Sequence, residues 1–192
     1  FFRVGPNTRL RGPRDRNIYW AVLKHEISSC ETCYSWNIVN SWRRGDRERF
    51  LEGMYSLCAG GISPQTYINC EHRNAMYGTL FVAPLMTWCI RQAMVDDQLE
   101  EGEIHLLRLC PAAWLSTGEE TVFENMPTLS GPASLRAGLS GDGSTLNVTF
   151  HGDRRKRPEK VVLHVPPVPG IRSVSINGKR HARRDRFEWK DV

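Results

Sequence analysis

The side chains best suited to chemistry lie in residues 63–74 and just beyond. Glu71 is the only carboxylate in that segment, and a carboxyl group can act as a general acid or base when its pKa lies near the working pH. Structural interpretations stay open, in which Glu71 pairs with Arg73 or caps the helix that follows. Hydrogen-bonding side chains that could bind a hydroxylated ligand surround Glu71, namely Tyr67, His72, Arg73, Asn74 and Tyr77.

Glu31 and Cys33 form a second group, because carboxylates and thiolates are ligands that zinc accepts. Cys30 and Cys33 lie one turn apart on a predicted helix, a spacing that is more typical of core residues. We therefore expect no metal and no cofactor, with Glu31 and Cys33 as the candidates if a metal does bind.

Three predicted helices must position these groups. The apolar pattern predicts helices over residues 31–44, 47–59 and 79–95, and Asp46 can cap the second one. The first two are separated by Gly45 and Asp46 alone, which is typical of an antiparallel helical hairpin. The third has almost no polar face, so we expect it to be buried, or to leave an apolar patch that a partner covers.

Beyond Gly102 the apolar period changes from 3.6 residues to 2. Leu146, Val148 and Phe150 alternate with polar residues, and Asn177-Gly178 is a strong signal for a hairpin turn. Helices followed by strands predict an α+β chain of two domains. We expect a helical segment at residues 1–102 and an antiparallel β-sandwich at residues 103–192.

Charge is uneven along the chain. The net charge is +5, but residues from 151 onward hold 12 basic and 5 acidic side chains, whereas residues 1–150 hold 14 basic and 16 acidic ones. The run from Arg154 to Arg157 could bind nucleic acid or an acidic polymer, or it could be a solvated hairpin tip. No aromatic residue is interleaved with the run, which argues against nucleic acid.

Targeting signals are absent from the sequence pattern. The chain begins at Phe1 without a charged and apolar leader, and its longest apolar run is too short to span a bilayer. The six cysteines are scattered, so we expect buried free thiols. These features favour a soluble chain, without membrane contact and cut from a longer protein; the cysteines favour the cytoplasm, although the compartment stays open.

The order of elements resembles the end of the catalytic domain in six-hairpin glycosidases. In those (α/α) barrel enzymes, which include the α-L-rhamnosidase-like and α-L-fucosidase-like families, a loop with acidic residues precedes the last inner helix. A strand similar to Ile104-His-Leu-Leu-Arg-Leu-Cys-Pro-Ala-Ala-Trp114 then leads into a C-terminal sandwich, which often has a strand similar to Ser173-Val-Ser-Ile-Asn-Gly178. The Glu31-Thr-Cys33 segment, in turn, resembles one from bacterial β-L-arabinofuranosidases that helps to bind zinc.

The resemblance implies a partial (α/α) barrel followed by a sandwich, and a glycoside hydrolase that acts on plant or microbial carbohydrates. It implies a catalytic role for Glu71, with the surrounding side chains holding the sugar. A second carboxylate is required in most such enzymes and is expected in a missing N-terminal portion. The partner that we expect is therefore either this missing portion or, in an oligomer, another copy of the chain. A carbohydrate-binding or protein-interaction module without catalysis stays open, and so does a basic domain that binds nucleic acid.

Overall fold

The computed structural model describes residues 36–62, 66–68, 70–72, 75–77, 82–153 and 156–190. Residues 36, 37, 60, 70–72 and 75–77 are described by their backbone only. The chain forms two compact units that divide in sequence between Arg91 and Gln92. The first is mainly helical and the second consists mainly of strands, so the predicted α+β class is confirmed.

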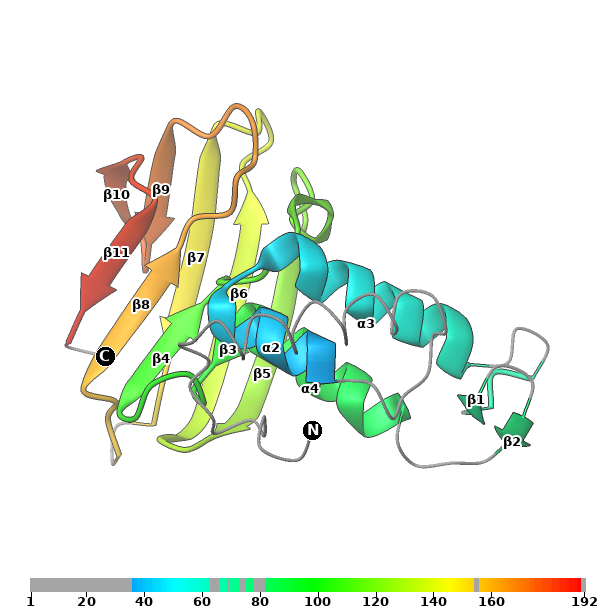
Figure 1. The fold of residues 1–192 in the computed structure, drawn as a ribbon. Helices are drawn as coiled ribbons and strands as arrows, with labels where there is room; N and C mark the ends of the chain where they lie inside the picture. The colour runs from blue at the N-terminus through cyan, green and yellow to red at the C-terminus, as the bar shows by residue number, and fades with distance from the viewer. Residues whose placement is uncertain are drawn as a thin grey trace. The chain divides into compact units, whose positions relative to one another are not determined.

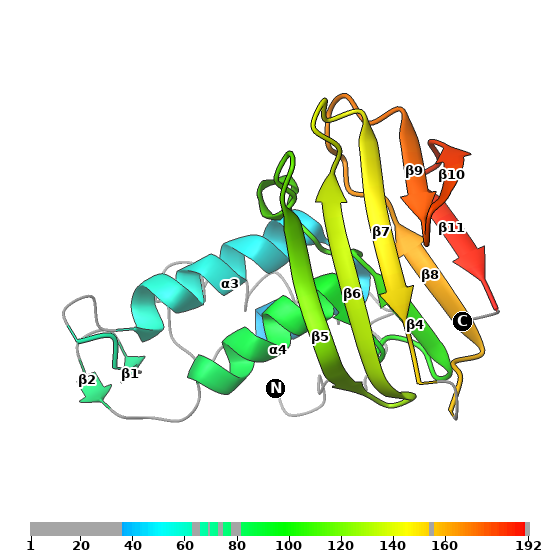
Figure 2. The same cartoon turned by 180° about the vertical axis from the view of Figure 1, so that it is seen from behind.

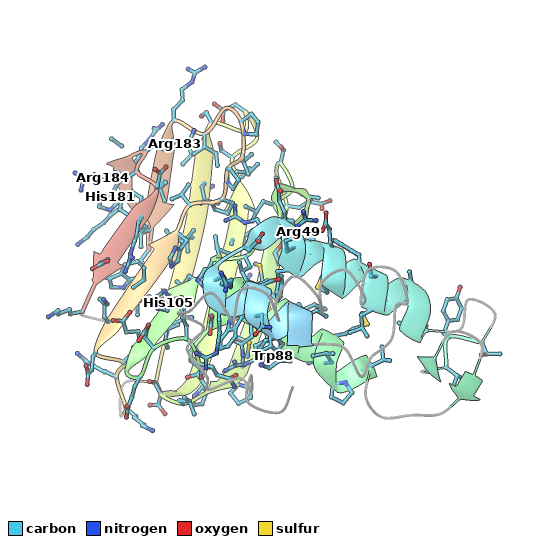
Figure 3. The ribbon with its side chains drawn as sticks, viewed as in Figure 1. Arg49, Trp88, His105, His181, Arg183 and Arg184 are labelled. Carbon is cyan, nitrogen blue, oxygen red and sulfur yellow. The ribbon has the colours of Figure 1, made fainter. Side chains whose placement is uncertain are left out.

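The first unit is built from helices α2 (Trp36–Arg44), α3 (Arg47–Gly61) and α4 (Val82–Met94), of which the last runs into the second unit. The predicted cap of α3 is confirmed, because the Asp46 carboxylate accepts a hydrogen bond of 3.2 Å from the backbone N–H of Arg49. Trp42 meets Trp88 edge to face, with ring centroids 5.3 Å apart; Trp88 is labelled in Figure 3. This contact and a 3.5 Å approach of Cys58 Sγ to Met86 Sδ join α4 to the helical pair.

The sequence suggests a loop over residues 63–74, but the structure has a short strand within this segment. Short strands β1 (Cys70–His72) and β2 (Ala75–Tyr77) pair antiparallel, with Cys70 opposite Tyr77 and His72 opposite Ala75. The expectation of a continuous loop is therefore wrong at residues 70–72, because their backbone groups pair with those of β2.

The second unit contains two sheets (Figure 1). One has five strands in the order β10-β9-β7-β6-β5, and the other has four in the order β11-β8-β4-β3. Figure 2 shows the five-stranded sheet in front of the other. The strands are β3 (Val95–Asp96), β4 (Glu103–Leu106), β5 (Glu120–Thr128), β6 (Gly131–Leu139), β7 (Thr145–His151), β8 (Lys160–His164), β9 (Ser173–Ile176), β10 (Lys179–Ala182) and β11 (Arg186–Trp189).

One apolar core lies between these sheets. Leu135 and Phe150 come from the five-stranded sheet, Ile104 and Leu163 from the four-stranded sheet, and all four side chains are buried in the same cluster. A one-turn 3-10 helix, Ala112–Trp114, follows β4 and places Trp114 against this cluster. Burial of the apolar side chains that face this cluster holds the two layers together.

The prediction that this unit is antiparallel throughout is wrong for two strand pairs. β4 pairs with β8 in parallel, and so does β7 with β9. The physical reason is that the chain crosses to the other sheet between the two members of each pair. Strands that are neighbours in a sheet are therefore separated in sequence, and a hairpin no longer sets their relative direction.

Two further expectations can be compared with the described residues. Cys89 and Cys110 carry buried free thiols, which confirms the prediction for these two, whereas the free thiol of Cys58 is only partly buried. In the described part of the chain, no helix is long and apolar enough to cross a membrane.

Candidate functional site

The structure describes only some of the predicted site residues, and most of these by their backbone alone. Glu71 and His72 belong to β1 and Tyr77 to β2, where the backbone alone is described. The side chain of Tyr67 is 80% exposed. Arg73, Asn74, Glu31 and Cys33 lie outside the described residues. The grouping of these side chains around Glu71 thus stays a prediction.

A polar ladder, defined as Asp96, Glu103, His105, Arg108, Lys160 and His164, lies on and next to the four-stranded sheet of the second unit. Register explains its assembly, because Glu103 pairs with Lys160 across β4 and β8, and His105 pairs with Asp96 across β4 and β3. The Lys160 ammonium lies 2.6 Å from Glu103 Oε1, and Arg108 lies 3.6 Å from Asp96 Oδ2. His105 Nδ1 and His164 Nε2 share a hydrogen bond of 2.9 Å.

Burial controls the protonation of the ladder's central histidine. His105 is 4% exposed, and its desolvation lowers its pKa to about 4. Glu103, whose Oε2 is 3.2 Å from His105 Nε2, acts in the opposite direction but does not overcome burial. His105 is consequently neutral near pH 7 and accepts or donates hydrogen bonds without carrying charge. Among the described residues, no group of three or more His, Cys, Asp or Glu side chains could hold a metal ion.

A groove opens where the two sheets of the second unit end. β10 is the last strand of the five-stranded sheet and β11 is the last strand of the four-stranded sheet. We call the hollow that their residues line the edge groove; its volume is about 310 Å³. The lining residues are Ile176, Asn177, Lys179, His181, Phe187, Glu188 and Trp189.

The hairpin between β9 and β10 positions one wall of the edge groove. Asn177 and Gly178 have φ values of 47° and 82°, as a tight hairpin turn requires, and they confirm the turn that the sequence predicts. The Asn177 side chain accepts a 2.9 Å hydrogen bond from the N–H of Phe150 and donates one of 3.2 Å to the carbonyl of Phe150. This pair of hydrogen bonds to β7 fixes the turn, so that Lys179 and His181 follow at defined positions.

Alternation along β11 supplies the other wall. Phe187 and Trp189 are half-buried against the core cluster, whereas Arg186 and Glu188 are exposed and form an ion pair of 2.7 Å. The rings of Phe187 and His181 lie with their centroids 5.6 Å apart. The groove therefore offers an aromatic surface rimmed by polar and charged groups, an arrangement that suits a small ligand with both apolar and polar faces.

Sequence reasoning missed the edge groove, although a signal was present. Phe187 and Trp189 flank Glu188 with the two-residue period of a strand, shortly after the Asn177-Gly178 turn and a run of basic residues. Such a strand beside a hairpin predicts an exposed aromatic pair, but only the pairing of β11 with β8 places it opposite β10.

A second hollow lies along α3 in the first unit, lined by Arg49, Glu52 and Tyr55 among others. All the lining residues that the structure describes belong to this one helix, and Arg49 forms an ion pair of 2.6 Å with Glu52. It is the side of a helix and offers no converging groups. The edge groove and the polar ladder are thus the chemically distinctive features of the described residues. A scan of protein-family models and searches of curated proteins and solved structures find no match to this chain.

Proposed function

We propose that this chain is the C-terminal portion of a glycoside hydrolase that acts on plant or microbial oligo- and polysaccharides. The observation that carries the proposal is the order of elements. A helical pair, α2 and α3, is followed by α4, and the chain then passes through β4 and Ala112–Trp114 into a two-sheet unit. On this proposal α2 to α4 are the last helices of an (α/α) six-hairpin barrel, and the second unit is the β-sandwich that follows it.

Glu71 is the proposed catalytic carboxyl. It would donate a proton to the leaving oxygen or activate water, and glycoside hydrolysis needs a second carboxylate to complete the step. Tyr67, His72, Arg73, Asn74 and Tyr77 would bind the sugar. The short hairpin of β1 and β2 supports this role in part, because paired strands hold Glu71, His72 and Tyr77 at fixed backbone positions.

The test is turnover of the complete gene product on a panel of aryl glycosides and oligosaccharides. Changing Glu71→Gln keeps the shape of the side chain and removes its titrating group, and it should lower kcat by about a hundredfold to ten-thousandfold. Glu119→Gln is the matched control, because Glu119 is exposed in the second unit, and it should leave kcat unchanged.

Two results would count against the proposal, and a third would favour a structural role for Glu71. Wild-type turnover in the Glu71→Gln variant would remove Glu71 from the reaction. Saccharide binding with no turnover on any substrate of the panel would favour the alternative of a carbohydrate-binding module without catalysis. A fall of the melting temperature together with activity would favour the structural interpretation, in which Glu71 holds Arg73 or the helix that follows.

A further inference from the structure

The edge groove has a composition that selects a ligand class. Its base is apolar and aromatic, since Phe187 and Trp189 pack against the core on one side and line the groove on the other. The C–H faces of a pyranose ring pack on such aromatic surfaces, and buried aromatic area dominates the energetics of small sites. A sugar ring fits this surface better than a fully polar ligand does.

The rim of the groove is strongly basic. Residues 179–190 hold six Lys or Arg side chains against two carboxylates. Figure 3 shows Arg183 and Arg184 at the end of the second unit that carries β10, close to His181. Among the described residues that line the groove, one is acidic, Glu188, and it forms an ion pair of 2.7 Å with Arg186.

Some of these cationic side chains donate hydrogen bonds to other parts of the second unit. Arg180 donates to Ser173 Oγ at 3.0 Å, and Arg183 donates to the carbonyl of Ile171 at 3.2 Å. Within the part of the chain that the structure describes, Lys179 and Arg184 form no ion pair, although Lys179 lines the groove. A concave site beside like charges concentrates their field and favours an anionic ligand.

Size and charge placement distinguish a saccharide from a nucleic acid. The volume of about 310 Å³ lies at the small end of small-molecule sites, which run from about 300 to 1,000 Å³. Single-stranded nucleic acid needs a longer track, in which basic and aromatic residues follow at least about four nucleotides. Glu188 can also accept hydrogen bonds from the hydroxyl groups of a saccharide.

We propose that the edge groove between β10 and β11 binds an acidic oligosaccharide, a chain of sugars that carries carboxylates. Trp189 and Phe187 contact the face of one ring, and Lys179 and Arg184 pair with the carboxylates of that ring and its neighbour. The inference goes beyond the proposed function, because it assigns a binding site in the second unit that does not depend on Glu71 or on hydrolysis.

Binding is measured by titration calorimetry on the full 192-residue chain with three probes. They are a short oligogalacturonate, a neutral oligosaccharide of the same length, and oligothymidylate. We expect the acidic oligosaccharide to bind at least about tenfold more tightly than the other two, and to weaken as salt rises because the rim charges are exposed. Equal binding of the neutral oligosaccharide, tighter binding of the oligonucleotide, or no binding of the acidic probe would each overturn the proposal.

Matched variants locate the site. Lys179→Met removes a rim charge, and Arg157→Met removes an exposed charge of the basic run, which lies outside the groove. The first should weaken binding of the acidic oligosaccharide at least about fivefold and the second less than twofold, in keeping with loss of one charged contact. Equal losses in both variants would show that general positive charge, and not the groove, attracts the ligand.

Two further variants separate the aromatic contact from folding and from catalysis. Trp189→Ala should lower affinity about tenfold or more, because it removes the aromatic face on which the sugar ring packs. Trp189→Phe keeps an aromatic face and should recover most of the affinity; if it does not, the ring is structural and the proposal fails. Glu71→Gln should leave binding unchanged, so that failure of the hydrolase proposal and failure of this one are told apart.

Discussion

The two groups of charged side chains in the second unit differ in how their charge is satisfied. In the polar ladder, Glu103 meets Lys160 at 2.6 Å and Arg108 meets Asp96 at 3.6 Å, and the six members are buried or partly buried. At the rim of the edge groove, Lys179 and Arg184 are exposed and form no ion pair within the described residues. The ladder uses its charges to hold strands together, whereas the rim keeps charge available to a ligand. Substitutions in the two groups should therefore differ in what they damage.

The largest loss of stability is expected from Asp96→Ala. Asp96 is fully buried, accepts a 3.0 Å hydrogen bond from the N–H of Gln98, and faces Arg108. Removing one partner of a buried ion pair leaves the other charge uncompensated and costs about 3–5 kcal/mol. Urea unfolding should show this loss, and Arg184→Ala, the control at the rim, should stay within about 0.5 kcal/mol. A loss below about 1 kcal/mol for Asp96→Ala would mean that the ladder is not structural.

Acid should weaken the fold through His105. The pKa of His105 falls from 6.5 in the unfolded chain to about 4 in the fold, so the unfolded state binds the proton first as pH drops. Its contribution to stability is complete above pH 6.5 and is lost progressively as the pH falls from 6.5 to about 4. The expected loss is about 1–3 kcal/mol, at about 1.4 kcal/mol for each unit of pKa.

The His105→Gln variant tests the origin of that slope. Glutamine does not titrate, so the free energy of unfolding of the variant should vary less with pH between 4 and 6.5 than that of the natural chain. Above pH 7 the free energies of unfolding of the natural chain and of the variant should vary with pH in the same way. Identical slopes below pH 6.5 would assign the acid sensitivity to other groups.

A smaller effect is expected from Glu103→Gln. It removes the ion pair with Lys160, which is partly buried, at a cost of about 0.5–1 kcal/mol. Glu103 also raises the pKa of His105, so the variant should titrate His105 at a still lower pH. NMR titration of the imidazole protons measures this directly, and an upward movement of the pKa would contradict the arrangement of the ladder.

The smallest change in stability is expected from Lys179→Met. Its ammonium is exposed and holds no other strand, so unfolding free energy should stay within about 0.5 kcal/mol of the natural value. The same substitution should weaken the acidic oligosaccharide, and this dissociation of stability from binding is what distinguishes the rim from the ladder. A melting temperature that fell as far as in Asp96→Ala would erase the distinction.

Local signals allowed the helices to be predicted well. Asp46 marks the start of α3 and its side chain caps the N–H of Arg49, while Gly45 with φ of 72° ends the turn before it. The end of α3 at Gly61 differs from the predicted one, because glycine lowers helix propensity without forbidding the last turn. Strand β7 was visible for the same reason, since buried residues alternate with less buried ones along it. β8 and β9 were predicted from apolar residues two apart, although the buried residues are consecutive in both strands.

The remaining strands depend on long-range contacts. In β6 the buried residues are Ala133, Leu135, Ala137, Gly138 and Leu139, and three of these are too small to give a clear apolar alternation. All four residues of β10 are exposed, so its pattern contains no apolar signal at all. The parallel pairs and the edge groove follow from crossings between sheets, which no local pattern encodes. The side chains around Glu71 lie mostly outside the described residues, so their grouping stays a prediction.

The parallel pairing described above also sets an order on synthesis and folding. β8 lies between β4 and β11, and β9 lies between β7 and β10, so each sheet closes around a strand from late in the chain. Contacts so distant in sequence form slowly, and the earlier strands wait with their apolar faces exposed until the last ones leave the ribosome. The walls of the edge groove are those last strands. A ligand that bridges β10 and β11 would bind only the folded unit, so it would slow unfolding without speeding folding.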